Sequence, residues 1–441
     1  MMINKIFNIL IIQIFLSSNV FAEELKTSPL SFADCVKETN ENNPELLSLY
    51  HSKDASAFQQ KVAQADYRPS IGAGLSSQRS DSWGGRNNYG NGFSQGGSIT
   101  NMNSASSDRT TVTGTISVTQ NIFSGFANDA ALEQATAGYA ESKANIALAK
   151  ARISAELKTS FSTLLYWQRY VKLATKITQR RKENLDVVSL RYKGGNENKG
   201  SYLQAKALYE QALYEKEQAL REVESSRIAL AKVLGRPDAS TLQIIDGDMP
   251  PLVIAKYDLE TEIINHPEVR LSQARKENAE AQLKTARSAL YPSINLTAQS
   301  GVMDGDSMDS MENYAIGLDA SIPIFTFGRN KNKVSKAKSD LAAAKASEVA
   351  TMQAVRSNIK SAYTAMKSAQ DKVQIQTNLR EASAVRAEIG RHKYNIGLLN
   401  FENWDIIETE LINYQKSELL SERERVVAEA NWEQSIGEGA L

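Results

Sequence analysis

The sequence contains little cysteine, proline or histidine, and each scarcity excludes a class of protein. Its 441 residues include one cysteine, nine prolines and three histidines. Cys35 alone cannot form an intrachain disulfide, and we expect it to pack as a small apolar residue. The histidines His51, His266 and His392 lie far apart, and no HExxH or nucleophile-elbow motif occurs. The pattern therefore predicts no enzyme, no cofactor and no metal site built on histidine.

An excess of charge of one sign and a long hydrophobic run are also absent. The 51 basic and 51 acidic residues balance, which argues against a nucleic-acid partner. No later stretch reaches the roughly 18 apolar residues of a membrane-spanning helix. Near the N-terminus, Lys5 precedes an apolar run over residues 6–16, and Val20 and Ala22 occupy the positions that signal peptidase reads. Residues 1–22 are predicted to be a secretory signal peptide.

What the sequence does contain is an internal repeat. NNPEL at residues 42–46 returns as NHPEV at residues 265–269, and in both copies the next proline follows 25 residues after the first. Two further intervals also match: Phe123 to Tyr192 and Phe325 to Tyr394 are both 69 residues, and Gly195 to Gly235 and Gly397 to Gly437 are both 40. Matched spacing predicts two copies of one structural unit, residues 23–235 and 258–441, joined by a linker over residues 236–257.

Each repeat predicts the same order of elements. A helix stops before a proline, two strands with apolar residues at every second position form a hairpin, and a proline-free helix of about 65 residues follows. A glycine-containing turn then leads into a return helix. The predicted ranges are helix 31–67, hairpin 70–123, long helix 127–192 and return helix 201–234, then helix 258–291, hairpin 293–325, long helix 330–394 and return helix 401–436.

The long helices and the strands indicate an assembly of several chains. From Met352 to Val373 apolar or small residues recur at steps of three and four, which is typical of a coiled coil. Four strands cannot close a barrel, and open strand edges cannot face lipid. Three chains would supply an even-numbered barrel of about twelve strands. The signal peptide, the absence of a long apolar helix and the alternating strands together point to the bacterial outer membrane.

The motifs resemble those of the TolC-like outer-membrane efflux proteins, the outer membrane factors. The resemblance covers essentially the whole mature chain and rests on duplicated motifs: NNPEL and NHPEV, YRPSIG and YPSINL, QNIFSGF and PIFTFGR, RYKGG and KYNIG. It implies an α+β membrane protein, a trimeric 12-stranded outer-membrane β-barrel with four strands per chain that continues into a long α-helical coiled-coil tunnel in the periplasm. The implied assembly is a homotrimer in contact with outer-membrane lipid. It also implies partners, namely a periplasmic adaptor (membrane fusion protein) and an inner-membrane pump of the RND, ABC or MFS type. The implied function is a passive exit duct of a tripartite efflux or type I secretion system.

The resemblance places function at the two turns, residues 192–203 and 394–406. The implied gate residues are Tyr394, Gly397, Leu399, Glu402, Asn403, Asp405 and Ile406, and the implied adaptor-docking residues are Gly195, Ser201, Gly397 and Leu398. Members of the family carry aspartates where Asn403 and Ile406 stand and a basic residue where Leu399 stands. Glu402, Asp405 and Glu408 are therefore candidates for an acidic ring in a shifted register. The alternative is that these residues only cap and solvate the helix ends.

The acidic segment 304–313 suggests a calcium loop, but Asp309 stands at its glycine position and Ala315 at its glutamate position, so an extracellular hairpin loop is expected instead.

The alternative function is a non-conducting periplasmic coiled-coil scaffold, against which the alternating strands and the signal peptide count. For a duct, drug efflux, type I protein secretion and metal export stay open, although the lack of histidine or methionine clusters disfavours a dedicated metal exporter.

Overall fold

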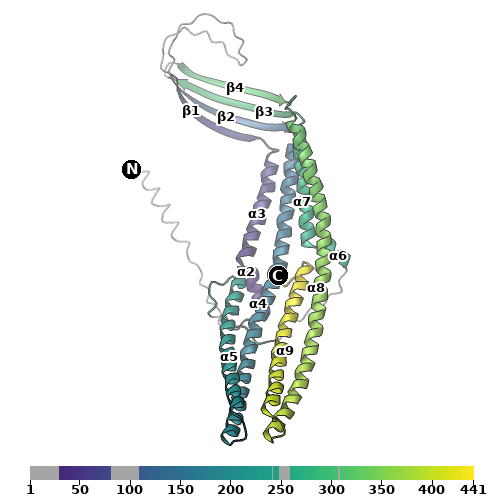
Figure 1. Ribbon diagram of the computed structural model, residues 1–441. Coiled ribbons are helices and arrows are strands. Elements are labelled where there is room, and N and C mark those ends of the chain that lie inside the picture. Colours follow the sequence, from purple (N-terminus) through teal and green to yellow (C-terminus); the bar gives the residue numbers. More distant parts are fainter. Residues whose placement is uncertain (1–28, 81–108, 241, 248–258, 306–307) are drawn as a thin grey trace, which may run out of the picture. The chain divides into compact units, whose positions relative to one another are not determined.

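The computed structural model describes residues 29–80, 109–240, 242–247, 259–305 and 308–441 (Figure 1). The predicted signal peptide, most of the loop of the first hairpin and the end of the linker lie outside the described residues. The described chain forms two compact units, each assembled from both repeats. The first unit draws on residues up to 47, 150–256 and 359–441, and the second on residues 48–149 and 257–358.

Both predicted hairpins are present, and they join into one antiparallel sheet. Its strands are β1 (Ser70–Ser80), β2 (Arg109–Phe123), β3 (Ser293–Gly305) and β4 (Met308–Ser321). The order is β1-β2-β3-β4, so β2 and β3 pair across the repeat boundary. β4 ends four residues before the predicted limit of the second hairpin. Strands β1 and β4 are the two edges of the sheet.

One face of this sheet is apolar and exposed. The register sets Ile71 opposite Val118 and Leu296 opposite Leu318, so alternate residues of all four strands share that face. Tyr314 on this face is 89% exposed. The opposite face carries mainly threonine, serine, glycine and asparagine. An exposed apolar face of this extent is unfavourable in water and suits contact with lipid.

The long and return helices follow the prediction closely. In the first repeat α4 spans Ala127–Lys193 and α5 spans Lys199–Leu234; in the second, α8 spans Arg329–Asn395 and α9 spans Phe401–Ser435. The apolar seams lie inside: Ile153, Leu157, Phe161 and Leu164 of α4, and Val355, Ile359 and Met366 of α8, are all buried. Within the described residues, no helix combines the length and apolarity needed to cross a membrane.

The prediction of a single helix over residues 31–67 is wrong. The structure has α2 (Phe32–Asn42) and α3 (Pro44–Ala65) in its place. Asn43 separates them in an extended conformation, and its side-chain oxygen accepts hydrogen bonds from the backbone N–H groups of Glu45 and Leu46, at 3.0 and 3.1 Å. Proline has no N–H to lose at a helix start, so Pro44 begins the second helix rather than continuing the first.

The second repeat has the same break, so the prediction of one helix over residues 258–291 is also wrong. Here α6 (Leu259–Asn265) and α7 (Pro267–Ser288) flank His266. The imidazole Nδ1 of His266 accepts a hydrogen bond from the backbone N–H of Glu268 at 3.2 Å. His266 thus caps α7 as Asn43 caps α3. Asn-Pro in the first repeat and His-Pro in the second therefore each mark a helix boundary.

Candidate functional site

The two predicted turns have the same backbone geometry. Gly195 and Gly397 adopt left-handed conformations, with φ of 75° and 79°. The N–H of Gly195 bonds the carbonyl of Tyr192 and that of Gly397 bonds the carbonyl of Tyr394, both at 3.0 Å. This arrangement ends α4 and α8 identically, and a side chain at either glycine would be strained.

Asparagine caps the return helix after each turn. The Asn198 side chain accepts from the N–H of Ser201 at 2.9 Å, and the Asn400 side chain accepts from the N–H of Asn403 at 3.1 Å. Ser201 and Asn403, both predicted as functional residues, therefore sit at the third position of their helices, where their backbones are capped. α5 starts two residues earlier than predicted, because its cap is Asn198.

Aromatic side chains form a small core directly above the turns. Tyr394 is fully buried and stacks on Trp404, with ring centroids 4.2 Å apart and planes 13° from parallel. Phe401, Val188 and Ala205 complete the cluster, so it draws on α4, α5, α8 and α9. Residues from all four helices thus hold the two helical hairpins together at this end of the unit.

Tyr394 also joins the two turns through polar contacts. Its hydroxyl donates to the Glu197 carboxylate at 3.0 Å, and Arg191 Nη1 donates to the Tyr394 carbonyl at 2.9 Å. The Arg191 guanidinium lies 4.8 Å from the centre of the Tyr394 ring. Burial of the phenol, together with the Glu197 carboxylate, raises the pKa of Tyr394 well above its ordinary value near 10.

We expect Tyr394→Phe to change the pH dependence of stability at alkaline pH. Because folding raises the pKa of this phenol, its contribution is complete below about pH 10 and is lost as the pH rises through the folded-state pKa. Below about pH 10 the variant should lose about 2 kcal/mol, the value of a hydrogen bond to a charged acceptor. Melting temperatures of both proteins between pH 8 and pH 12 measure this difference. It should shrink with rising pH, and a constant difference would contradict the assignment. Tyr192→Phe, in the other turn, is the control.

Above the aromatic cluster, a buried glutamate of α9 pairs with an arginine of α4. Glu408 is 0% exposed, and Arg180 donates to both its oxygens, from Nε at 2.5 Å and from Nη2 at 2.9 Å. Arg391 lies 3.9 Å from the same carboxylate. The hydrogen bonds to Glu408 raise the pKa of Arg180 above its usual value. This bidentate pair links the helical hairpin of the first repeat, α4 and α5, to the helical hairpin of the second repeat, α8 and α9.

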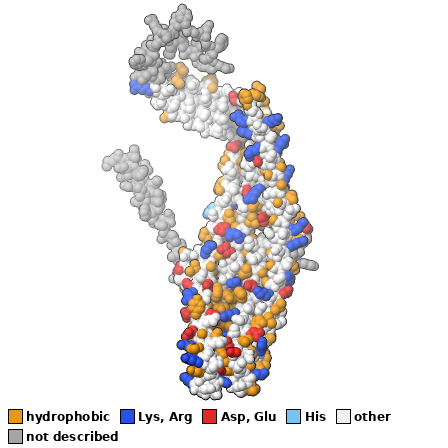
Figure 2. Space-filling model, viewed as in Figure 1, with side chains coloured by type: hydrophobic (Ala, Val, Ile, Leu, Met, Phe, Trp, Pro, Cys, Tyr) orange, Lys and Arg blue, Asp and Glu red, His pale blue; other side chains and the backbone are white. Residues whose placement is uncertain are grey.

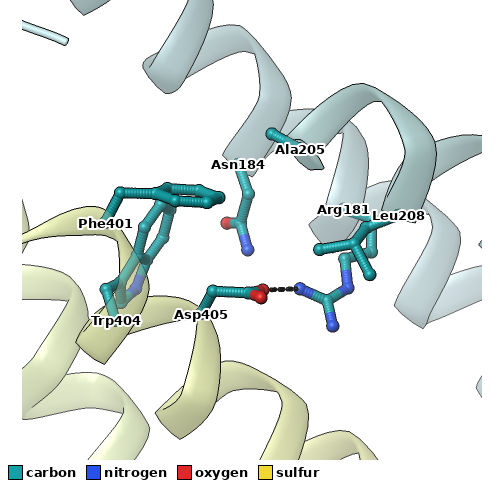
Figure 3. Close-up of a pocket in the computed structure, with 7 residues that line it drawn as sticks. All are labelled: Arg181, Asn184, Ala205, Leu208, Phe401, Trp404 and Asp405. Atoms are coloured by element: carbon teal, nitrogen blue, oxygen red, sulfur yellow. Dashed lines mark hydrogen bonds and ion pairs between the residues drawn. The ribbon is translucent and has the colours of Figure 1, made fainter. Parts of the chain in front are cut away.

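A second pair lies beside it (Figure 3). Arg181 Nη1 donates to Asp405 at 2.8 Å, and both side chains are largely buried. Asp405 also accepts from Gln204 of α5 at 3.1 Å. We call the pairs Arg180–Glu408 and Arg181–Asp405 the arginine clamp.

A small cavity lies beside the arginine clamp, among α4, α5 and α9. Its volume of about 10 Å³ is room for about one water molecule. The residues that line it are Arg181, Asn184, Ala205, Leu208, Phe401, Trp404 and Asp405. Trp404 is 2% exposed, and its indole N–H has no acceptor among the described residues.

The structure distributes the predicted gate residues among different roles. Tyr394 is the centre of the aromatic cluster, and Leu399 packs against its edge. Glu402 and Ile406 are exposed, and so is Leu398, which was predicted as a docking residue. Asp405 and Glu408 pair with Arg181 and Arg180, whereas Glu402 is exposed, and an acidic ring built from several copies stays a prediction. Sequence reasoning missed Arg180, Arg181, Arg191, Glu197 and Trp404.

The structure offers no support for a metal site at the acidic loop. Residues 306–307 of the segment 304–313 lie outside the described residues. Among the residues that are described, no group of three or more histidine, cysteine, aspartate or glutamate side chains is arranged to hold a metal ion.

Comparison with solved structures identifies the fold. A membrane protein from Pseudomonas aeruginosa superposes with a TM-score of 0.81 at 19% identity, covering 92% of this chain and 93% of that one. The outer-membrane channel OprN gives a TM-score of 0.80 at 18% identity, covering 93% and 90%. The outer membrane protein VceC from Vibrio cholerae gives 0.77 at 19% identity, covering 93% and 97%. The chain therefore has the fold of these outer-membrane channels.

Comparison of sequences identifies the family. Outer membrane protein OprJ of Pseudomonas aeruginosa is 25% identical over 283 residues, which is 62% of this chain and 57% of OprJ. The probable efflux pump outer membrane protein SepC of Pseudomonas putida is 33% identical over 132 residues, 29% of this chain and 27% of SepC. The alignments thus span at most 57% of the length of these two relatives. The family model described as outer membrane efflux protein matches residues 35–236 and 259–438, nearly all of both repeats. The chain belongs to the outer membrane efflux protein family, a family of outer membrane channel proteins rather than of enzymes.

Proposed function

We propose that the protein is the passive outer-membrane exit duct of a tripartite efflux or type I secretion system. The observation that carries this proposal is the sheet, which has an exposed apolar face and two unpaired edges, β1 and β4. Such edges are not stable in lipid unless another copy covers them. Three copies, joined β4 to β1, would form a closed barrel of about twelve strands in contact with outer-membrane lipid.

The two turns are the proposed periplasmic gate and docking site. The arginine clamp and the Tyr394 cluster hold α9 against α4 in each copy, so opening requires these contacts to separate. Exposed Ile396 and Leu398 next to Gly397 offer an apolar surface to a periplasmic adaptor, and Gly195 and Ser201 mark the matching turn of the first repeat. An inner-membrane pump of the RND, ABC or MFS type would supply the energy, since the sequence contains no nucleotide-binding motif.

The names of several relatives favour efflux as the function. SepC is described as a probable efflux pump outer membrane protein, and TtgF of Pseudomonas putida as a toluene efflux pump outer membrane protein. We extend the general role, export across the outer membrane, to this chain.

Single-channel recording in a planar bilayer tests the duct and the gate together. We expect the purified protein to give a small, stable conductance that rises severalfold in the double variant Arg180→Met/Arg181→Met, because the arginine clamp no longer holds α9 to α4. Lys182→Met is the matched control, since Lys182 is the next residue of α4 and is exposed without an ion pair among the described residues.

Two other outcomes would change the proposal. If the conductance of Lys182→Met rose by the same factor, the arginine clamp would have no part in gating. A folded trimer that stays silent, even after deletion of residues 394–405, would exclude the duct and favour the periplasmic scaffold.

A further inference from the structure

Basic side chains gather where α8 begins, a few residues after the end of β4. Residues 329–338 contain five basic residues and no acidic residue, whereas the corresponding residues 127–136 at the start of α4 contain two acidic residues and no basic one. The five are Arg329, Lys331, Lys333, Lys336 and Lys338, and all are exposed and belong to the same compact unit. Because α4 forms the same kind of helix without them, the fold does not require this charge.

The charge is also unfavourable for the helix that carries it. A helix N-terminus has a partial positive charge, which favours acidic side chains and opposes basic ones. Asp129 stands in the first turn of α4, but the first turn of α8 has no acidic residue. A locally unfavourable arrangement that is present in only one of two repeats indicates a role in binding.

Exposed apolar side chains precede the basic group. Phe325 and Phe327 have ring centroids 4.6 Å apart, and Phe327 is 91% exposed. Ile324 beside them is exposed as well. Figure 2 shows apolar side chains at the sheet end of the helices, with lysine and arginine side chains directly beneath. Aromatic and aliphatic side chains bordered by basic ones are typical of a membrane–water interface.

Three of the basic residues are spaced to share one anionic group. Arg329, Lys333 and Lys336 follow one another at steps of four and three, so they lie on one helix face with neighbouring Cβ atoms about 6 Å apart. Lys336 forms an ion pair with Asp340 at 2.7 Å, but that pair is exposed and therefore weak. Arg329 and Lys333 have no ion pair within the described part of the chain.

The remaining lysines of this region are arranged differently. Lys331, Lys338 and Lys345 recur every seven residues on another face of α8. Neighbours in this series are about 10 Å apart along the helix axis. At about 3.6 residues per turn they lie on the side of α8 opposite Arg329, Lys333 and Lys336, so they provide a matched comparison.

We propose that Arg329, Lys333 and Lys336 bind the phosphate of an anionic phospholipid headgroup at the periplasmic surface of the outer membrane. Phe325 and Phe327 lie in the adjoining interfacial layer. The source of the phosphate is a lipid rather than a free anion, because the apolar side chains continue directly from the basic face. This inference deepens the proposed lipid contact, and it rests on the outer-membrane placement of the sheet.

Lipid binding to the delipidated full-length protein in detergent tests the proposal. Native mass spectrometry would count bound dioleoylphosphatidylglycerol and dioleoylphosphatidylcholine during parallel titrations. The parent protein should prefer phosphatidylglycerol. The variant R329Q/K333Q/K336Q should bind it about a hundredfold more weakly, from a loss of about fivefold for each charge near an anionic lipid surface. The variant R329K/K333R/K336R should retain binding, which separates charge from packing.

The control variant is K331Q/K338Q/K345Q, which removes the same charge from another face of α8. It should bind phosphatidylglycerol within about threefold of the parent, because exposed charges that do not contact the headgroup are screened by salt and contribute little. Equal losses in the two glutamine variants, or equal binding of the two lipids by the parent, would overturn the proposal. Inorganic phosphate that displaces the lipid at equal concentration would overturn it in favour of a free-anion site. Bilayer conductance is recorded separately, so a failure of the duct would be distinguished from a failure of lipid binding.

Discussion

Replacing Arg180 by methionine should increase hydrogen exchange in the first three turns of α9 about a hundredfold. The change leaves the Glu408 carboxylate buried without its bidentate partner, and breaking one side of a buried ion pair costs about 3 kcal/mol. Exchange of backbone amides reports the free energy of local opening, so the cost appears at α9 even if the rest of the protein stays folded. The measurement is hydrogen–deuterium exchange of the detergent-solubilised protein over residues 401–412.

The double variant Arg180→Met/Glu408→Leu is the matched control. It removes both charges and fills the space with apolar atoms, which is often close to neutral for stability. We expect its exchange to return to within about tenfold of the parent, because no unpaired buried charge remains. If the single variant exchanged no faster than the double variant, the Arg180–Glu408 pair would have no part in holding α9.

Replacing Trp404 by alanine should make local opening of the turn between α8 and α9 more frequent. Trp404 is 2% exposed and stacks on Tyr394, so its removal leaves a cavity at the point where α4, α5, α8 and α9 meet. Truncation of a buried tryptophan costs about 4 kcal/mol. Trypsin cleavage after Arg391 and Lys393, in the last turns of α8, measures the population of the opened form. We expect cleavage to be about a thousandfold faster.

Ile396→Ala serves as the control for this variant. Ile396 lies in the same turn but is 70% exposed, and exposed substitutions usually change stability by no more than about 0.5 kcal/mol. Trp404→Phe should lie between parent and Trp404→Ala, because a phenyl ring preserves part of the stacking. Equal cleavage of Trp404→Ala and Ile396→Ala would show that the aromatic cluster does not close the turn.

The long elements of this fold could be predicted because their signals are local. The alternation of apolar and polar residues predicts strands β1 to β4, and the absence of proline over more than sixty residues predicts α4 and α8. The breaks at Asn43 and His266 also had a local signal, namely the proline that follows each. A proline is compatible with the first turn of a new helix, and that possibility distinguishes a break from a continuous helix.

The candidate site was less predictable because its contacts join distant parts of the chain. Arg180 and Glu408 are 228 residues apart, and Tyr394 and Glu197 are 197 apart. Nothing in the spacing of a single helix indicates that Arg180 and Arg181 point toward carboxylates of the other repeat. The sequence marked the carboxylates Asp405 and Glu408 as candidates for an acidic ring, which stays a prediction, but it gave no sign of their pairing with arginines of the other repeat. Fold and family, by contrast, are confirmed by the comparisons.

The unpaired edges β1 and β4 also bear on how the protein is made. In the proposed trimer each strand edge is complete only when another copy covers it, so one polypeptide cannot finish the sheet. Folding of the sheet and association of the copies would then be a single event. Until that event each newly exported copy offers two templates for incorrect pairing. In a closed ring, one copy with a damaged edge also disables the intact copies beside it. A cell that makes a mixture of normal and edge-damaged copies would lose more function than the damaged fraction alone accounts for.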